Sequence, residues 1–215
     1  MAAIRDGVAA LHQELPDAAT GKLATLLLEL ERWNARVNLT AIRDPAAMVA
    51  GHLLDSLVVR PFIEGTRLID VGTGAGFPGL PLAIADPGLE VELLDSSGKK
   101  IAFVQHIIRE LGLGNAHAVK ARVESYAPSR RFDTVVVRAL GAIPNLLDIA
   151  GHLVSDHGAL LALKGHYPHD ELLELSRMNR LADRWEHRAS VLTVPGLERH
   201  ARHVVRLWKK PAVPA

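Results

Sequence analysis

The sequence contains no cysteine in its 215 residues. Disulfide bonds, thiolate metal sites and cysteine nucleophiles are therefore excluded. Long apolar runs are missing as well, because no stretch is long enough to span a bilayer. Charged side chains interrupt residues 1–17 (MAAIRDGVAALHQELPD), so we expect no signal peptide there and a cytoplasmic location.

The composition that remains is that of a globular protein with one well-buried core, at 48% hydrophobic and 23% charged residues. Apolar residues recur at helical spacing over 17–35, which predicts an amphipathic helix. A second helix should begin at Pro45, with Asp44 as its cap. We therefore predict an N-terminal helical extension, residues 1–66, followed by a second unit, residues 67–215.

Strands and helices alternate through the middle of the chain, which predicts a parallel, doubly wound sheet. The tail departs from this alternation, because two β-like segments near 188–194 and 202–208 are joined only by a turn at Pro195 and Gly196. Such neighbours must pair antiparallel. We therefore expect a Rossmann-like α/β fold whose mostly parallel, seven-stranded sheet has an antiparallel last strand. This is the layout of class I methyltransferases, whereas the sheet of a typical dehydrogenase continues parallel.

Positive charge is gathered at the C-terminal end. Residues 177–215 hold nine Lys and Arg against three Asp and Glu, although the net charge of the whole chain is only +1. Two interpretations stay open: a basic patch that meets an anionic partner, and a solvated sheet edge.

Two overlapping glycine patterns follow the first predicted strand, in DVGTGAGFPG (70–79). Gly72, Gly74 and Gly76 form G-x-G-x-G, which suggests S-adenosylmethionine. Gly74, Gly76 and Gly79 form G-x-G-x-x-G, which suggests a nicotinamide or flavin cofactor. Asp70 favours the first pattern, because a carboxylate there suits the methionine ammonium and does not suit a pyrophosphate.

Asp95 ends the second predicted strand, about 20 positions beyond the loop. An acidic residue at this place binds ribose hydroxyls in both ligand classes, so it predicts an adenosine ligand without separating them. It is equally suited to capping the following helix, and the two roles are compatible because each uses one oxygen.

The motifs taken together resemble the ribosomal RNA small-subunit methyltransferase G family. The resemblance rests on LIDVGTGAGFPGLPLAI, LLDSSGKKIAFV, ARVE, VVVRAL and ALKG, and on WNARVNLTAIRDP and HLLDS ahead of them. It implies a class I S-adenosylmethionine-dependent methyltransferase that methylates N7 of one guanosine in 16S ribosomal RNA. It further implies that Gly72 and Phe77 contact S-adenosylmethionine, that Val123 and Glu124 lie along the adenine, and that Arg138 faces the cofactor and the target base.

The chemistry of guanine N7 agrees with these residues. N7 carries a lone pair and no proton, so its methylation needs no general base, and no catalytic acid or base is assigned. The segment after the fourth predicted strand accordingly lacks the polar N-P-P-Y-like signature of amino-group methylators. Arg138 is expected to position the base through O6 or a phosphate, or else to form a salt bridge with Asp70 or Glu124.

Further candidates for contact with RNA are Lys164, which follows the fifth predicted strand, and His52. His52 and Asp55 share a helix face, and Asp55 is expected to pin the extension to the sheet. Aromatic residues make up only 4% of the chain, so RNA shape and phosphates should dominate over base stacking.

Two other functions remain possible at this point. One is an NAD(P)-dependent oxidoreductase that uses the second glycine pattern, and the other is a non-catalytic RNA-binding protein on a methyltransferase fold. No histidine pair stands at a convincing ligand spacing, so we expect no metal. The expected partner is the small-subunit ribosomal RNA or the 30S particle, with no membrane and with the protein acting as a monomer.

Overall fold

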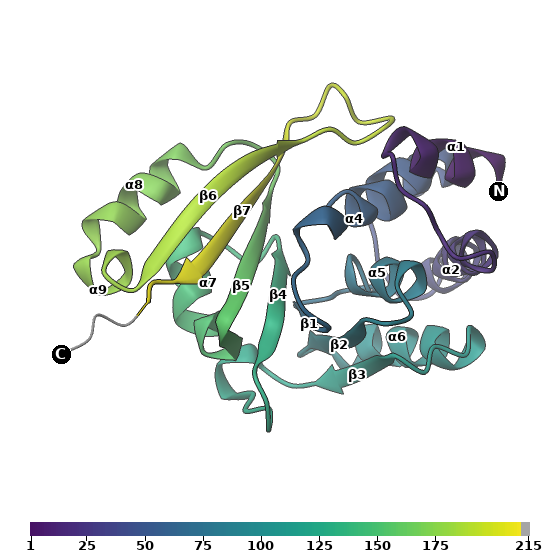
Figure 1. Ribbon diagram of the computed structural model, residues 1–215. Helices are drawn as coiled ribbons and strands as arrows, with labels where there is room; N and C mark the ends of the chain where they lie inside the picture. Colours follow the sequence, from purple (N-terminus) through teal and green to yellow (C-terminus); the bar gives the residue numbers. More distant parts are fainter. Residues whose placement is uncertain (212–215) are drawn as a thin grey trace.

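The computed structural model describes residues 1–211 and shows a seven-stranded sheet with helices on both faces (Figure 1). The strands lie in the order β3-β2-β1-β4-β5-β7-β6, and β7 alone among them runs in the opposite direction to the other six. The predicted fold class is thereby confirmed, including the antiparallel last strand. The strands are β1 (Arg67–Val71), β2 (Glu90–Asp95), β3 (Ala116–Lys120), β4 (Phe132–Arg138), β5 (Val154–Lys164), β6 (Trp185–Leu192) and β7 (Arg202–Lys209).

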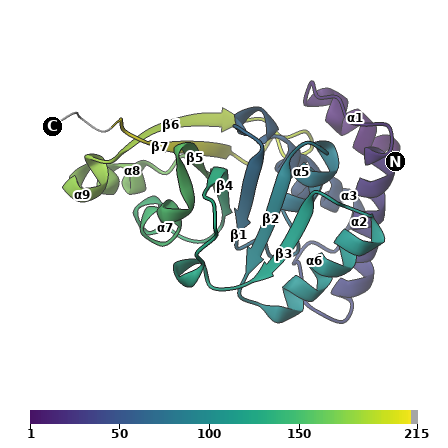
Figure 2. The same ribbon diagram turned by 60° about the horizontal axis from the view of Figure 1, so that its bottom comes forward.

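Helices cover the two faces of the sheet separately, as Figure 2 shows. On one face, α5 (Gly79–Ala85) and α6 (Gly98–Glu110) pack beneath β1 to β3 and the N-terminal helices cover them. The other face is covered by α7 (Ile143–Ala150), α8 (His169–Arg177) and α9 (Asn179–Ala182). Each face has its own apolar core, because strand side chains alternate between the faces.

The sheet reverses its winding direction between β1 and β4, which are parallel neighbours. From β1 the chain moves outward to β2 and β3, and it then returns to β4 on the opposite side. The loops that follow β1 and β4 therefore diverge and leave a crevice at the carboxyl ends of these strands, where doubly wound folds bind their ligands.

The N-terminal segment is helical as predicted, and its core is continuous with that of the sheet. It comprises α1 (Ala2–Ala10), α2 (Ala19–Asn34), α3 (Pro45–Met48), the π-helical η1 (Val49–Leu54), α4 (Asp55–Leu57) and the 3₁₀ turn η2 (Arg60–Phe62). Leu23 and Leu30 of α2 belong to the same apolar cluster as Leu80 of α5 and Phe103 of α6.

Two details of this segment go beyond the sequence-based prediction. Asp44 does cap the second predicted helix, since its carboxylate accepts from the Ala46 and Ala47 amides (3.4 and 3.0 Å). That helix nevertheless widens to π geometry over η1, where local features often serve function. Helix α1 was not predicted.

None of the helices in residues 1–211 combines the length and apolarity needed to cross a membrane.

Candidate functional site

The glycine loop after β1 adopts a backbone that only glycine tolerates well. Gly72, Gly74 and Gly76 have φ values of 70°, 61° and 87°, in the left-handed region that side chains disfavour. The Gly72 and Thr73 amides donate to the Leu94 carbonyl at the end of β2 (2.8 and 3.0 Å). The loop is therefore fixed to the neighbouring strand, and its free backbone faces the crevice.

The three glycines are needed for different reasons. Gly72 and Gly74 line the cavity at the crevice, whereas Gly76 does not. A Cβ on Gly76 would collide with the side chain of Leu80, so this position requires glycine for packing. Gly79 lies outside the G-x-G-x-G pattern, and it too is needed for packing. A Cβ there would lie 2.9 Å from Asp70 Oδ2.

Asp95 braces the loop from the end of β2. Its Oδ2 accepts from the Gly74 amide (3.0 Å), and its Oδ1 accepts from the Ser97 amide at the start of α6 (2.8 Å). Lys100 Nζ stands 3.7 Å from Oδ2. The carboxylate still lines the cavity, and each oxygen retains a lone pair for a ligand hydroxyl.

Asp70 was expected to face the ligand, and this placement is wrong. The residue is only 1% exposed and does not line the cavity. Its Oδ2 instead accepts from the Thr73 hydroxyl (2.6 Å) and from the Gly79 amide (2.8 Å). Asp70 thus ties the loop to the start of α5 from beneath. Burial raises the pKa of Asp70 to about 6, against the opposing effect of these hydrogen bonds.

This raised pKa predicts a stability effect that depends on pH. The folded-state pKa of about 6 exceeds the ordinary value of 3.8. Ionisation of Asp70 therefore lowers the free energy of unfolding as the pH rises between these two values. The cost is absent below about pH 4 and reaches about 3 kcal/mol at neutral pH. Asp70→Asn removes it. The unfolding free energy of the variant, relative to the parent, should therefore rise between pH 4 and pH 7.

Denaturant titrations across this range measure the difference. The gain in unfolding free energy of Asp70→Asn over the parent should persist at low and high ionic strength, because salt screens a buried carboxyl only weakly. A difference that stays constant with pH would show that Asp70 titrates normally.

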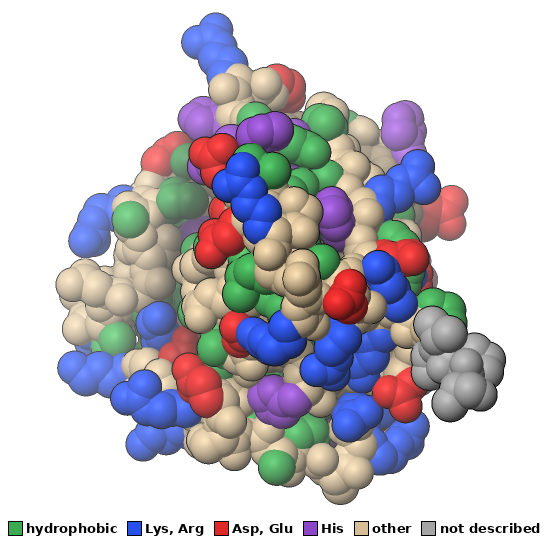
Figure 3. Space-filling view, turned by 90° about the vertical axis from the view of Figure 1, so that its left-hand side faces the viewer, with side chains coloured by type: hydrophobic (Ala, Val, Ile, Leu, Met, Phe, Trp, Pro, Cys, Tyr) green, Lys and Arg blue, Asp and Glu red, His purple; other side chains and the backbone are tan. Residues whose placement is uncertain are grey.

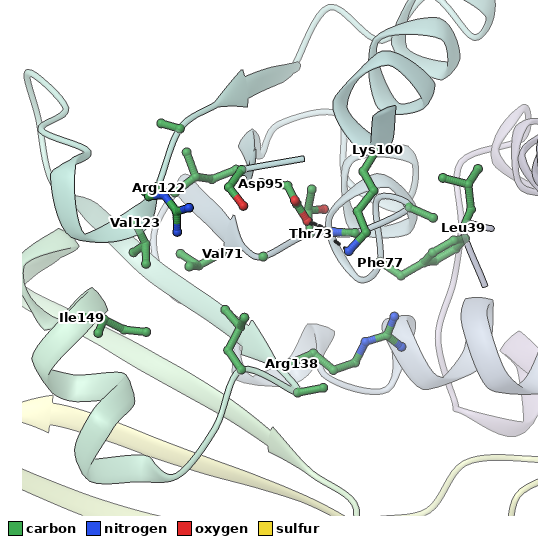
Figure 4. A pocket seen from close by; sticks show the side chains of 18 of the residues that line it. Leu39, Val71, Thr73, Phe77, Asp95, Lys100, Arg122, Val123, Arg138 and Ile149 are labelled. Carbon is green, nitrogen blue, oxygen red and sulfur yellow. Dashed lines mark hydrogen bonds and ion pairs between the residues drawn. The ribbon is translucent and has the colours of Figure 1, made fainter. Parts of the chain in front are cut away.

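The cavity measures about 650 Å³, a size usual for small-molecule sites. Its walls come from the segments after β1, β2, β3 and β4 and from the N-terminal segment. Figure 4 shows Asp95 and Arg138 on opposite sides of it. Phe77 of the glycine loop is stacked on His52 of η1, with ring centroids 4.6 Å apart. The predicted site residues that line the cavity are Gly72, Gly74, Phe77, Asp95, Val123, Glu124, Arg138 and His52.

His52 closes one end of this cavity. Its Nε2 lies 2.9 Å from the Thr40 hydroxyl, while Nδ1 is buried with no hydrogen-bond partner in the described chain. Burial, and next the positive charge of Arg138, lower the pKa of His52 to about 4. The ring is therefore neutral at physiological pH.

The opposite end is formed by the 3₁₀ turn η3 (Val123–Ser125) together with Ile149 of α7. Val123 packs at the edge of the apolar core, and Glu124 beside it is exposed. An apolar wall with a polar rim suits a flat heterocycle with polar edges.

Arg138, at the end of β4, pairs with neither Asp70 nor Glu124, which corrects that alternative. Its Nη1 lies 3.4 Å from Asp55 Oδ2, and Asp55 Oδ1 accepts from Arg202 Nε of β7 (2.8 Å). Asp55 does pin the extension to the sheet, as predicted, and it does so through two arginines. Arg202 was missed because only the folded tail brings it to Asp55, 147 residues away.

Lys164 is already engaged within the protein. Its Nζ donates to the Gly141 carbonyl and to Glu171 Oε2, both at 2.7 Å, and its side chain is 13% exposed. Contact with a phosphate, as the sequence predicts, therefore requires this pair to open or the phosphate to approach its edge.

Much of the positive charge of the tail is paired with acidic residues elsewhere. Arg202 binds Asp55, Arg206 binds Glu64, and Lys209 binds Asp156. Figure 3 accordingly shows Lys and Arg interspersed with Asp and Glu on the face formed around β6 and α9. The tail is thus tied into the fold by these ion pairs, and its contact with an anionic partner stays a prediction. No group of three or more His, Cys, Asp or Glu in residues 1–211 could hold a metal ion.

Comparisons with known proteins give one family for most of the chain. The family model described as rRNA small subunit methyltransferase G matches residues 19–205. Ribosomal RNA small subunit methyltransferase G of Alkalilimnicola ehrlichii is 46% identical over 99% of this chain and 94% of its own length. The protein of that name from Aeromonas salmonicida is 47% identical over 86% of each chain.

Solved structures with low sequence identity share the fold. A SAM dependent methyltransferase from Aquifex aeolicus superposes with a TM-score of 0.56 at 18% identity, covering 86% of this chain and 97% of its own. An rRNA methylase from Streptococcus thermophilus gives 0.52 at 15% identity, with coverages of 75% and 97%.

Proposed function

Because this chain belongs to the rRNA small subunit methyltransferase G family, we propose that it methylates N7 of a guanosine in 16S ribosomal RNA. It is a methyltransferase, and S-adenosylmethionine is its methyl donor. One observation carries the choice of N7. The donor cavity and the neighbouring cavity share four lining residues, Thr40, His52, Arg138 and Ala139, with no carboxylate among them. We take this shared border, called the passage, as the place where the base meets the donor.

N7 transfer suits such a passage. The N7 lone pair attacks the sulfonium methyl in line, the new N–C bond forms as the C–S bond breaks, and the electron pair of that bond stays on sulfur. S-adenosylhomocysteine leaves, and the positive charge passes from sulfur to the purine. No proton moves, so the protein needs chiefly to align the two reactants.

Different residues of the cavity bind the donor and align the base with it. Gly72 and Gly74 present backbone to the methionine part of the donor, with Gly76 keeping the loop in shape, and Asp95 accepts from the ribose hydroxyls. Val123 and Glu124 lie along the adenine. Phe77 and neutral His52 flank the sulfonium without adding positive charge beside it, and Arg138 positions the base.

RNA engages the protein around this passage. His52 and Lys164 border the neighbouring cavity. Cations of the tail that have no acidic partner within residues 1–211 meet RNA phosphates, because attraction between opposite charges acts over about a Debye length. The protein works in the cytoplasm as a single chain. We also propose that residues 1–66 are an extension of the methyltransferase domain, 67–215, since they share its core.

The test is methyl transfer from labelled S-adenosylmethionine to small ribosomal subunits isolated from cells that lack this enzyme. The expected product is a single labelled nucleoside, 7-methylguanosine, within 16S ribosomal RNA. Label in a methylated amino group or in a protein, or no transfer at all, would contradict the proposal. NADH should not bind, since the oxidoreductase alternative predicts the reverse preference in calorimetry.

A further inference from the structure

A second cavity of about 610 Å³ adjoins the donor cavity. It lies between the N-terminal segment, the ends of β4 and β5, and the start of β7. The two cavities share the residues of the passage, Thr40, His52, Arg138 and Ala139. A base that enters the second cavity can therefore present one edge to the donor methyl.

The walls of this second cavity expose more apolar than polar surface, with Ile42, Val137, Leu146, Leu163 and Leu192 among them, and charged residues such as Lys164 and Glu171 border it as well. A base between such walls loses part of its contact with water. Each of its polar edge atoms must then find a partner in the protein, because an unpaired buried polar group is costly.

Asp55 and Arg138 supply those partners. The Asp55 side chain is 11% exposed, and within residues 1–211 its Oδ2 has one polar contact, a long one of 3.4 Å to Arg138 Nη1. A contact of this length leaves the oxygen with spare capacity to accept. Asp55 borders the second cavity only, whereas Arg138 borders both. An acceptor therefore borders the second cavity alone, and beside it a donor borders both cavities, next to the passage.

Guanine carries the complementary order along its edge. The N1–H and N2–H₂ groups donate, the adjacent O6 accepts, and N7 follows with its free lone pair. On the basis of the proposed function, we infer that the Asp55–Arg138 pair selects guanine, with Asp55 accepting from N1–H and N2–H₂ and Arg138 donating to O6. N7 then faces the passage.

The same pair rejects adenine. Adenine has an acceptor at N1 and a donor at N6, so Asp55 would face a lone pair and Arg138 would face hydrogens. Both contacts would be repulsive, and sites that pair with the polar edge of a substrate discriminate strongly against the wrong pattern. Arg202 supports the arrangement by holding the other Asp55 oxygen.

The decisive experiment replaces the target guanosine by inosine, which keeps N1–H, O6 and N7 but lacks the N2 amino group. Reconstituted small subunits carrying either nucleoside at the mapped position are methylated by the wild-type protein. We expect kcat/KM to fall about 10- to 100-fold with inosine. Equal rates for the two substrates would overturn the inference and leave the proposed function intact, whereas no transfer to guanosine would contradict the proposed function itself.

The variant Asp55→Asn adds a second readout. It should slow transfer to guanosine about 10- to 100-fold while reducing the preference over inosine to within about 3-fold, because the contact that distinguishes them is lost. Affinity for S-adenosylmethionine, measured by calorimetry, should stay within about twofold. A purely structural role would instead slow both substrates equally and keep the preference. The matched control is Asp148→Asn, an outer carboxyl paired with Arg180, which should retain the full preference.

Discussion

Alanine at Asp95 should weaken binding of S-adenosylmethionine about 100-fold or more. The carboxylate holds the Gly74 and Ser97 amides (3.0 and 2.8 Å), and it faces the cavity where we place the ribose. Its removal takes away the ribose acceptors and frees the loop that surrounds the donor. Two hydrogen bonds to a charged group contribute about 3 kcal/mol or more, which corresponds to a factor of 100 or more in affinity.

Isothermal titration with S-adenosylmethionine checks this expectation. Asp86→Ala is a matched control, because Asp86 also accepts from a turn amide, that of Gly88 (3.1 Å), but does not line the cavity. The control should bind like the parent. Affinity of Asp95→Ala within about threefold of the parent would show that the ribose lies elsewhere.

Alanine at Arg138 should lower kcat for methyl transfer about 100- to 1000-fold, with little change in affinity for S-adenosylmethionine. The guanidinium stands at the passage between the two cavities, where we propose that it holds O6 of the base. Its loss lets the base turn away from the line of attack, and misalignment of this kind is costly in rate. The pair with Asp55 is also lost, which leaves that carboxylate with Arg202 alone.

Single-turnover transfer to small subunits, together with donor titration, separates the two effects. Arg138→Lys keeps the charge but not the planar fork of donors, so it should recover only part of the rate. Arg180→Ala, which breaks an outer pair with Asp148, serves as the control. If Arg138→Ala lost donor affinity and rate in parallel, the residue would belong to the cofactor contacts and not to the base.

The sequence predicted the sheet well because its signals are local. The apolar runs that became β1 and β2 carry the burial pattern of strands covered on both faces. The short tail connection required antiparallel pairing, and β7 indeed runs against β5 and β6. Glycines at positive φ and an acid at the end of β2 are likewise local features, so the loop and Asp95 could be located in advance.

Side-chain direction could not be predicted in the same way. Asp70 is the penultimate residue of β1 and Asp95 the last residue of β2, yet Asp70 lies beneath the loop and Asp95 faces the cavity. The difference comes from Gly79, whose amide binds Asp70 (2.8 Å), and from the way α5 begins. The Arg138–Asp55–Arg202 network depends on contacts across 83 and 147 positions, and such contacts leave no periodic signal.

Two features of the backbone that the sequence did not predict also come from contacts between residues distant in sequence. The π-helical turns of η1 interrupt a helix that local propensity would continue, and they set His52 against Phe77 and Thr40. Strand β5 begins earlier than its apolar run, with a register shift against β4 next to Gly158. A Cβ at Gly158 would lie 2.6 Å from the Asp133 carbonyl, so this irregularity follows from the approach of a strand that is distant in sequence.

A crystal structure with S-adenosylhomocysteine tests the arrangement of the two cavities most directly. The ribose hydroxyls should lie within hydrogen-bonding distance of Asp95, the adenine should lie against Val123, and the sulfur should face the passage lined by His52 and Arg138. Bound S-adenosylhomocysteine whose ribose does not contact Asp95, or whose sulfur faces away from that passage, would contradict the proposed placement of donor and base in the two cavities.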